Sequence, residues 1–166
     1  MVSQISQVPL LCQPGSEWNY SVSTDVLGRL VEVWSGRSLD VFFADEIFAP
    51  LGMVDTGFSV AADRVGRFSA LYAPPSGGLL GGVANTDIDP SLGKPTGLVL
   101  QEGSSDSRFL KQSGPLSGGG GLVGTIDDYG RFCQMLMSGG ALGATRLLSP
   151  KTVGYMRQNQ LPDGKD

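Results

Sequence analysis

The residues best suited to chemistry lie in one stretch, PGSEWNYSVSTDVLG, at positions 14–28. Tyr20 comes just before a run that begins polar and becomes apolar, which is typical of a side chain displayed at the start of a helix. A tyrosine hydroxyl near a lysine can take a proton from a serine nucleophile. A tyrosine beside Trp18 is otherwise an ordinary core or rim aromatic. The residues alone leave both interpretations of Tyr20 open, catalytic base and packed aromatic.

The chain contains no histidine and two cysteines, Cys12 and Cys133, which limits the catalytic groups that it can offer. Without imidazole, these residues cannot form a Ser-His-Asp or Cys-His site or a zinc site that uses histidine. Two cysteines so far apart indicate neither a disulfide framework nor a metal cluster, and we expect reduced, partly buried thiols. Hydrolytic chemistry would therefore need another base, and no metal or cofactor is expected.

Four short matches to known motifs lack the context or the specificity that their chemistry requires. Gly119-x-Gly121-x-x-Gly124 is not preceded by a strand or followed by a suitably placed acidic residue, so we expect a tight loop that packs against another element and no dinucleotide site. Ser91-x-x-Lys94 contains a glycine and lies between prolines, so its side chains would not share a helix turn. The K-T-G-like segment 94–97 is interrupted by a proline, and Asn19-Tyr20-Ser21 is a glycosylation pattern of low specificity.

Composition and charge indicate a globular chain of one domain that binds neither nucleic acid nor membrane. The 166 residues are 40% apolar and 17% charged, and the formal net charge of −4 comes without a basic cluster for phosphates. No apolar stretch approaches the roughly 20 residues of a membrane span. The first residues lack the basic and apolar regions of a signal peptide. The cytoplasm is the favoured compartment, and the periplasm stays open because the protein's N-terminus could lie upstream.

Hydrophobic spacing predicts helix pairs with a small β element and long loops. Ser23 or Thr24 is expected to cap a helix that ends at Gly36, with Asp25, Arg29 and Glu32 on its outer side. The other expected elements are a helix from Ser38 to Pro50, strands at 67–73 and 98–101, a helix capped by Thr125 in a capping box with Asp128 and ended by Gly139-Gly140, and a helix from Pro150 to about Asn159 capped by Ser149. The inner faces are expected to contain Val26, Leu27, Leu30, Val31 and Trp34 in the first helix and Tyr129, Phe132, Cys133 and Leu136 in the third. Residues 76–124 form a glycine-rich loop region.

Three segments in order resemble the serine β-lactamase and penicillin-binding superfamily, most closely its family VIII carboxylesterases. They are WNYSVSTDVLG at 18–28, IFAPLGMVDTGF at 47–58, and GGGGLVGTIDDYGRFCQMLMSGG at 118–140 followed by RLLSPKTVGYM. The resemblance implies an α/β fold in which a helical lobe lies beside an antiparallel sheet. Residues 1–166 would be a single partial domain, mainly α, that supplies the helical lobe and is incomplete without the sheet.

The resemblance carries one catalytic position onto this chain, Tyr20, as base or proton shuttle. An S-x-x-K motif before Tyr20 and a K-T-G or W-G-G strand after it are absent from these residues. The leading hypothesis is an internal fragment of a carboxylesterase that forms an acyl-enzyme, inactive as an isolated chain. Val22 replaces an asparagine that is common in β-lactamases, which favours an ester over a β-lactam substrate.

Two alternative functions remain. One is a β-lactamase, D-amino-acid peptidase or acyltransferase of the same superfamily. The other is a non-catalytic helical module that binds a partner or forms a homo-oligomer through apolar helix faces exposed without the sheet.

Overall fold

The computed structural model describes residues 2–73, 97–111 and 116–161, and its chain divides into two compact units. Unit 1 comprises Met1–Phe58 and Gly114–Asp166, and unit 2 comprises Ser59–Ser113. The motif matches at 91–94 and most of the expected long loop lie outside the described residues. The expectation of a single partial domain stays a prediction.

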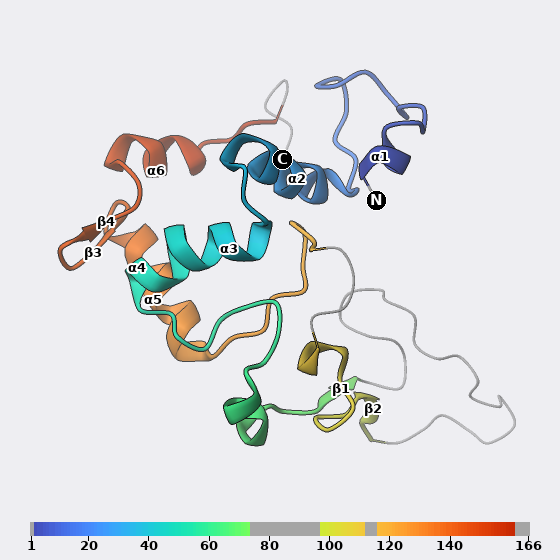
Figure 1. Cartoon of the computed structure of the whole chain (residues 1–166). Coiled ribbons are helices and arrows are strands. Elements are labelled where there is room, and N and C mark those ends of the chain that lie inside the picture. The colour runs from blue at the N-terminus through green and yellow to red at the C-terminus, as the bar shows by residue number, and fades with distance from the viewer. Residues whose placement is uncertain (1, 74–96, 112–115, 162–166) are drawn as a thin grey trace, which may run out of the picture. The chain divides into compact units, whose positions relative to one another are not determined.

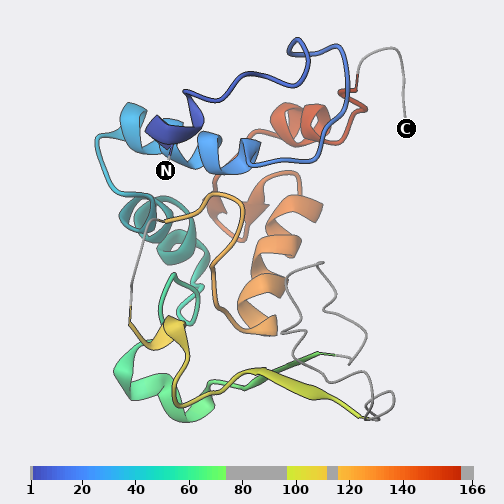
Figure 2. The same cartoon turned by 90° about the vertical axis from the view of Figure 1, so that its right-hand side faces the viewer.

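Unit 1 is helical with one small two-stranded sheet, as Figures 1 and 2 show. Its elements are α1 (Val2–Ile5), α2 (Ser23–Ser35), α3 (Leu39–Phe43), α4 (Ala49–Leu51), α5 (Ile126–Met137), β3 (Ala141–Leu142), β4 (Thr145–Arg146) and α6 (Pro150–Met156). α2 packs against α3, and α4 packs against α5. No helix in the described residues has the length and apolar character needed to cross a membrane.

Several predicted helix ends are confirmed. Gly36 ends α2 in the left-handed conformation with a φ of 69°, which glycine adopts without steric cost. Ser149 accepts a hydrogen bond from the Thr152 N–H at the start of α6, where Pro150 takes the first helical position. Thr125 caps α5 by accepting from the Asp128 N–H. Local sequence signals therefore locate these ends well.

Other details of the helices differ from expectation. α2 is not capped by Ser23 or Thr24, because Val22 occupies the cap position and makes no side-chain cap hydrogen bond. α6 ends at Met156, before Asn159. The expected inner faces are also incomplete. The exposed fractions are 57% for Leu27, 76% for Trp34 and 62% for Tyr129, while Gly28 and Met135 are buried.

The second predicted helix continues past its expected end at Pro50. α3 runs directly into a π-helical turn at Ala44–Phe48, and α4 then continues through Pro50 to Gly52. The wider π turn, with its Ala49 N–H bonded to the Ala44 carbonyl, precedes the proline. A π turn changes the hydrogen-bond register of a helix, so Pro50 is accommodated near the start of the last helical turn, where a missing N–H costs little.

The core of unit 1 lies between this π turn, α4 and α5. Its buried members are Phe48, Leu51, Met53 and Met135, and the partly buried side chains packed against them are Phe43, Ile47, Phe132, Leu136, Leu142 and Leu147. The Phe43 ring stacks against Phe58 with centroids 6.0 Å apart. This apolar cluster anchors the segment 49–58 to α5.

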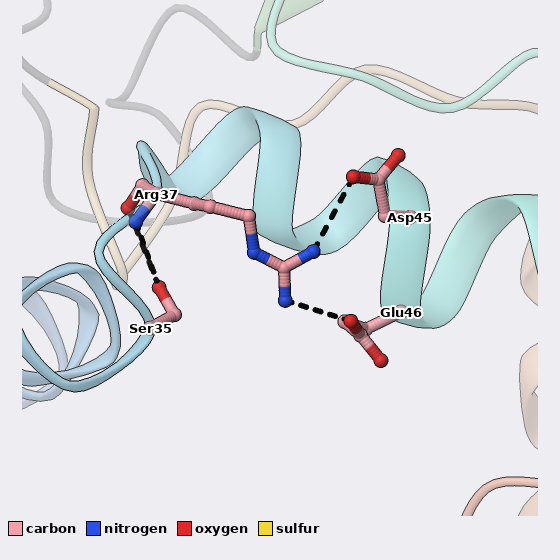
Figure 3. Close-up of polar contacts among 4 residues, drawn as sticks. All are labelled: Ser35, Arg37, Asp45 and Glu46. Atoms are coloured by element: carbon pink, nitrogen blue, oxygen red, sulfur yellow. Dashed lines mark hydrogen bonds and ion pairs between the residues drawn. The ribbon is translucent and has the colours of Figure 1, made fainter.

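The connection between α2 and α3 is held by ion pairs from Arg37, shown in Figure 3. Its guanidinium lies 3.3 Å from Asp45 and 2.7 Å from Glu46. It also lies over the Phe42 ring, 5.1 Å from the ring centroid. The Arg37 N–H also donates to the Ser35 hydroxyl. The hydrogen bond to Glu46 raises the pKa of Arg37, so the side chain stays charged. These contacts fix the short turn that joins the two helices.

Unit 2 contains the two expected short strands, which pair with each other in antiparallel orientation. β1 (Leu71–Ala73) pairs with β2 (Val99–Glu102) in the register Tyr72 to Leu100, with an irregularity beside Leu71. The strand expected at 67–73 is shorter than predicted, because Ala62–Arg67 forms a 3-10 helix. A second 3-10 turn, Arg108–Leu110, follows β2.

Candidate functional site

The side chain of Tyr20 lies just before α2 and is 90% exposed. Its ring lies near Trp18, with centroids 6.3 Å apart and an angle of 42° between the planes. Within the described residues Tyr20 is therefore no core aromatic, and its interpretation as a rim aromatic stays a prediction beside the catalytic one. Its hydroxyl is accessible, as a proton-transferring group requires. The catalytic role itself stays a prediction.

The start of α2 contacts the glycine-rich segment, which we define as residues 116–121. Ser117 donates a hydrogen bond from its hydroxyl to Asp25 Oδ1 at 2.5 Å, and the same hydroxyl accepts the Gly119 N–H at 3.0 Å. Asp25 was expected on the outer side of the helix, and its hydrogen bond to Ser117 corrects that expectation. Two segments about 90 residues apart in sequence thus meet within unit 1.

Backbone contact accompanies this hydrogen bond. A Cβ on Gly28 would lie 3.0 Å from Gly118 Cα and 3.1 Å from Leu39 Cδ2. A Cβ on Gly118 would overlap the Thr24 carbonyl oxygen and lie 3.0 Å from Gly28 Cα. Only glycine fits at such a close approach. The prediction that the glycines form a tight loop packed against another element is confirmed.

We expect Gly118→Ala to lower the free energy of unfolding by about 1–3 kcal/mol, because the added methyl group forces the glycine-rich segment away from α2. Gly120→Ala is the matched control, since a Cβ there meets no atom within 4 Å. Its effect should stay within about 0.5 kcal/mol. Urea unfolding of the two variants measures the difference. Equal loss of stability in both would show that the close contact at Gly118 is absent.

A second junction joins the other two segments that resemble the superfamily. The buried Asp128 carboxylate accepts hydrogen bonds from the Asp55 N–H at 2.7 Å and from the Thr56 hydroxyl at 2.8 Å. Gly57 and Val123 exchange two backbone hydrogen bonds beside them. The expected capping box is therefore only half formed: Thr125 caps α5, while the Asp128 side chain binds segment 55–56.

The structure brings together some of the predicted features and adds two residues. Tyr20 and the glycine-rich segment both adjoin the first turns of α2, whereas Cys12 and Cys133 are separate free thiols. Asp25 and Ser117 were missed as functional candidates. A serine directly before a glycine run and an acidic residue in a first helical turn are the signals that could have indicated them. No cluster of three potential metal ligands occurs among the described residues.

Comparisons with known proteins give matches along nearly the whole chain. The model of the beta-lactamase family matches residues 1–165. Protein Rv1367c of Mycobacterium tuberculosis is 32% identical over 162 residues, which are 98% of this chain and 35% of that protein. Esterase EstB of Burkholderia gladioli is 32% identical over 134 residues, 80% of this chain and 32% of that protein. The chain thus spans about a third of the length of these relatives.

Solved structures show the same similarity. Simvastatin synthase LovD from Aspergillus terreus superposes with a TM-score of 0.69 at 25% identity, covering 94% of this chain and 33% of that one. EstCE1, described as a hydrolase with promiscuous acyltransferase activity, superposes with a TM-score of 0.66 at 29% identity, covering 93% of this chain and 38% of that one. The arrangement of helices described above therefore recurs in both proteins.

Proposed function

Because the chain belongs to the beta-lactamase family, we propose that it supplies the tyrosine side of the active site in a serine carboxylesterase. The family match confirms the resemblance to serine β-lactamases and penicillin-binding proteins, whose hydrolase members include an esterase among the relatives above. The observation that carries the proposal is the exposed Tyr20 hydroxyl at the start of α2. An exposed phenol can both accept and donate a proton at a reacting ester.

The proposed reaction proceeds through an acyl-enzyme. A serine oxygen attacks the ester carbonyl and passes its proton to the Tyr20 oxygen, while the Tyr20 hydroxyl gives its own proton to a neutral lysine amine. Collapse of the tetrahedral intermediate breaks the bond to the alcohol, which leaves with that proton. Water then hydrolyses the acyl-serine by the reverse proton path. The serine and lysine of this reaction are not assigned to residues 1–166, since residues 1–19 contain no lysine and Ser91-x-x-Lys94 lies between prolines.

Val22 supports an ester substrate over a β-lactam. It lies at the cap position of α2, two residues after Tyr20, and offers no amide donor there. A site built to hydrogen-bond a polar substrate group loses much of its selectivity when the partner group is missing. Acyl transfer is the second candidate, favoured by the structural similarity to EstCE1. In that reaction an acceptor alcohol replaces water at the acyl-serine.

The test compares two substrates and two lengths of protein. Protein expressed with its adjoining coding sequence should hydrolyse p-nitrophenyl butyrate and leave nitrocefin, a β-lactam, nearly untouched. The 166-residue chain alone should release p-nitrophenolate no faster than its Tyr20→Phe variant. Faster nitrocefin than ester turnover would overturn the esterase assignment. Turnover by the short chain well above the variant would show that these residues contain their own nucleophile.

A further inference from the structure

We propose that Asp25 and Ser117 form a positioning pair that determines where the glycine-rich segment lies relative to the turn that carries Tyr20. The inference rests on the proposed function for its catalytic meaning, while the geometry stands by itself. Ser117 is the central residue: its hydroxyl donates to Asp25 and accepts from the Gly119 N–H. One side chain thereby ties the backbone of the glycine-rich segment to the first turn of α2.

The hydrogen bond is of a strong kind. The Ser117 hydroxyl lies 2.5 Å from Asp25 Oδ1, at the short end of the range for a hydroxyl that donates to a carboxyl oxygen. Both partners are partly buried, so water competes less well for the carboxylate. Next to this bond the two backbones meet at Gly28 and Gly118, where no side chain keeps them apart. The pair therefore supplies the polar part of a close-packed contact.

Tyr20 needs such support from its surroundings. Among the described residues its hydroxyl makes no hydrogen bond, and the described contact of its ring is with Trp18, itself 65% exposed. The cap position of α2 is also without a side-chain hydrogen bond. The position of the phenol thus depends on the backbone of residues 20–25. Asp25 ends that stretch, and its bond to Ser117 attaches the stretch to a second segment.

The alternative is a bond that only holds the glycine-rich segment in place, with no effect on Tyr20. The two roles differ in what changes when the bond is removed. A positioning pair transmits its loss to the Tyr20 ring, because the start of α2 shifts. A bond that only holds the glycine-rich segment in place affects amide exchange at Gly119 and leaves the Tyr20 signals unchanged.

The test is nuclear magnetic resonance of the 166-residue chain labelled with ¹³C at tyrosine and uniformly with ¹⁵N. The chain has four tyrosines, so the Tyr20 ring signals are assigned by their loss in Tyr20→Phe. Ser117→Ala and Asp25→Ala should both shift those signals. Ser117→Ala removes the acceptor of the Gly119 N–H and should speed amide exchange at Gly119 about two- to tenfold, the factor expected for a lost hydrogen bond between neutral groups. Asp25→Asn keeps an oxygen acceptor for the Ser117 hydroxyl. Its Tyr20 signals and amide exchange should therefore stay close to those of the wild type.

Ser149→Ala is the matched control, because Ser149 also accepts a backbone N–H a few residues ahead but lies at the start of α6. It should leave the Tyr20 signals unchanged. If Ser117→Ala speeds amide exchange at Gly119 but leaves the Tyr20 signals unchanged, the positioning role is overturned. Unchanged exchange would overturn the pair itself. Neither outcome depends on catalysis, so an inactive or differently specific enzyme would contradict the proposed function and leave this inference standing.

Discussion

Replacing Tyr20 by phenylalanine should lower kcat/KM for p-nitrophenyl butyrate by about 10²–10⁴-fold, the usual contribution of a general acid–base group. The measurement uses the protein expressed with its adjoining coding sequence. The substitution removes one oxygen and keeps the ring that contacts Trp18. Within the described residues Tyr20 is 90% exposed, so its oxygen contributes little packing to this part of the protein. The decrease should therefore report proton transfer and not a change in stability.

Tyr155→Phe provides the control for this prediction. Tyr155 is also an exposed tyrosine, at 63%, and lies in α6. Its substitution should leave kcat/KM within about twofold of the wild type, since exposed changes away from the site have small effects. A decrease of similar size in both variants would contradict the assignment of Tyr20. Urea unfolding of each variant shows whether a loss of fold contributes.

Asp128→Asn should lower the free energy of unfolding by about 2–4 kcal/mol, because the amide oxygen is a weaker acceptor than the carboxylate and an NH₂ group takes the place of the second oxygen in a buried site. The Asp55 N–H and the Thr56 hydroxyl both bind Asp128 Oδ2. Asparagine can satisfy them only through its single oxygen, and its NH₂ group must then find a partner in the buried site. Urea unfolding measures the loss.

Asp127→Asn is the neighbouring control. Asp127 also lies in the first turn of α5 but is exposed, so its substitution removes only a favourable interaction with the helix dipole. That change costs about 0.3–1 kcal/mol. Equal midpoints for the Asp127 and Asp128 variants would mean that the junction between residues 55–56 and α5 contributes nothing to stability. A lower midpoint for the Asp128 variant alone confirms the junction.

What could be predicted from sequence are features that depend on neighbouring residues. Gly36 at the end of α2, Thr125 at the start of α5 and the Ser149-Pro150 pair at α6 are local signals, because caps and turns are made within a few residues. The two strands β1 and β2 were also predicted, although the first strand proved shorter. The position of Tyr20 before a helix follows from the same kind of signal.

The missed features depend on contacts between distant residues. The spacing of Asp25 predicts a residue that faces solvent. Its carboxyl group is partly buried and accepts a hydrogen bond from Ser117, which is 92 residues away in sequence. Asp128 matches the acidic position of a capping box, yet its carboxylate accepts hydrogen bonds from the Asp55 N–H and the Thr56 hydroxyl instead. The π turn before Pro50 was not predicted, because a proline ordinarily indicates the end of a helix. Side-chain periodicity carries no information about which segment will pack against a given face.

The most direct test of the central claim is the first turnover of p-nitrophenyl butyrate in a stopped-flow experiment with the protein expressed with its adjoining coding sequence. The wild type should release a burst of about one equivalent of p-nitrophenolate, and mass spectrometry should detect the corresponding acyl-enzyme. In Tyr20→Phe the burst should slow by about 10²-fold or more. A burst of unchanged rate and amplitude in that variant would show that Tyr20 takes no part in acylation and would contradict the account.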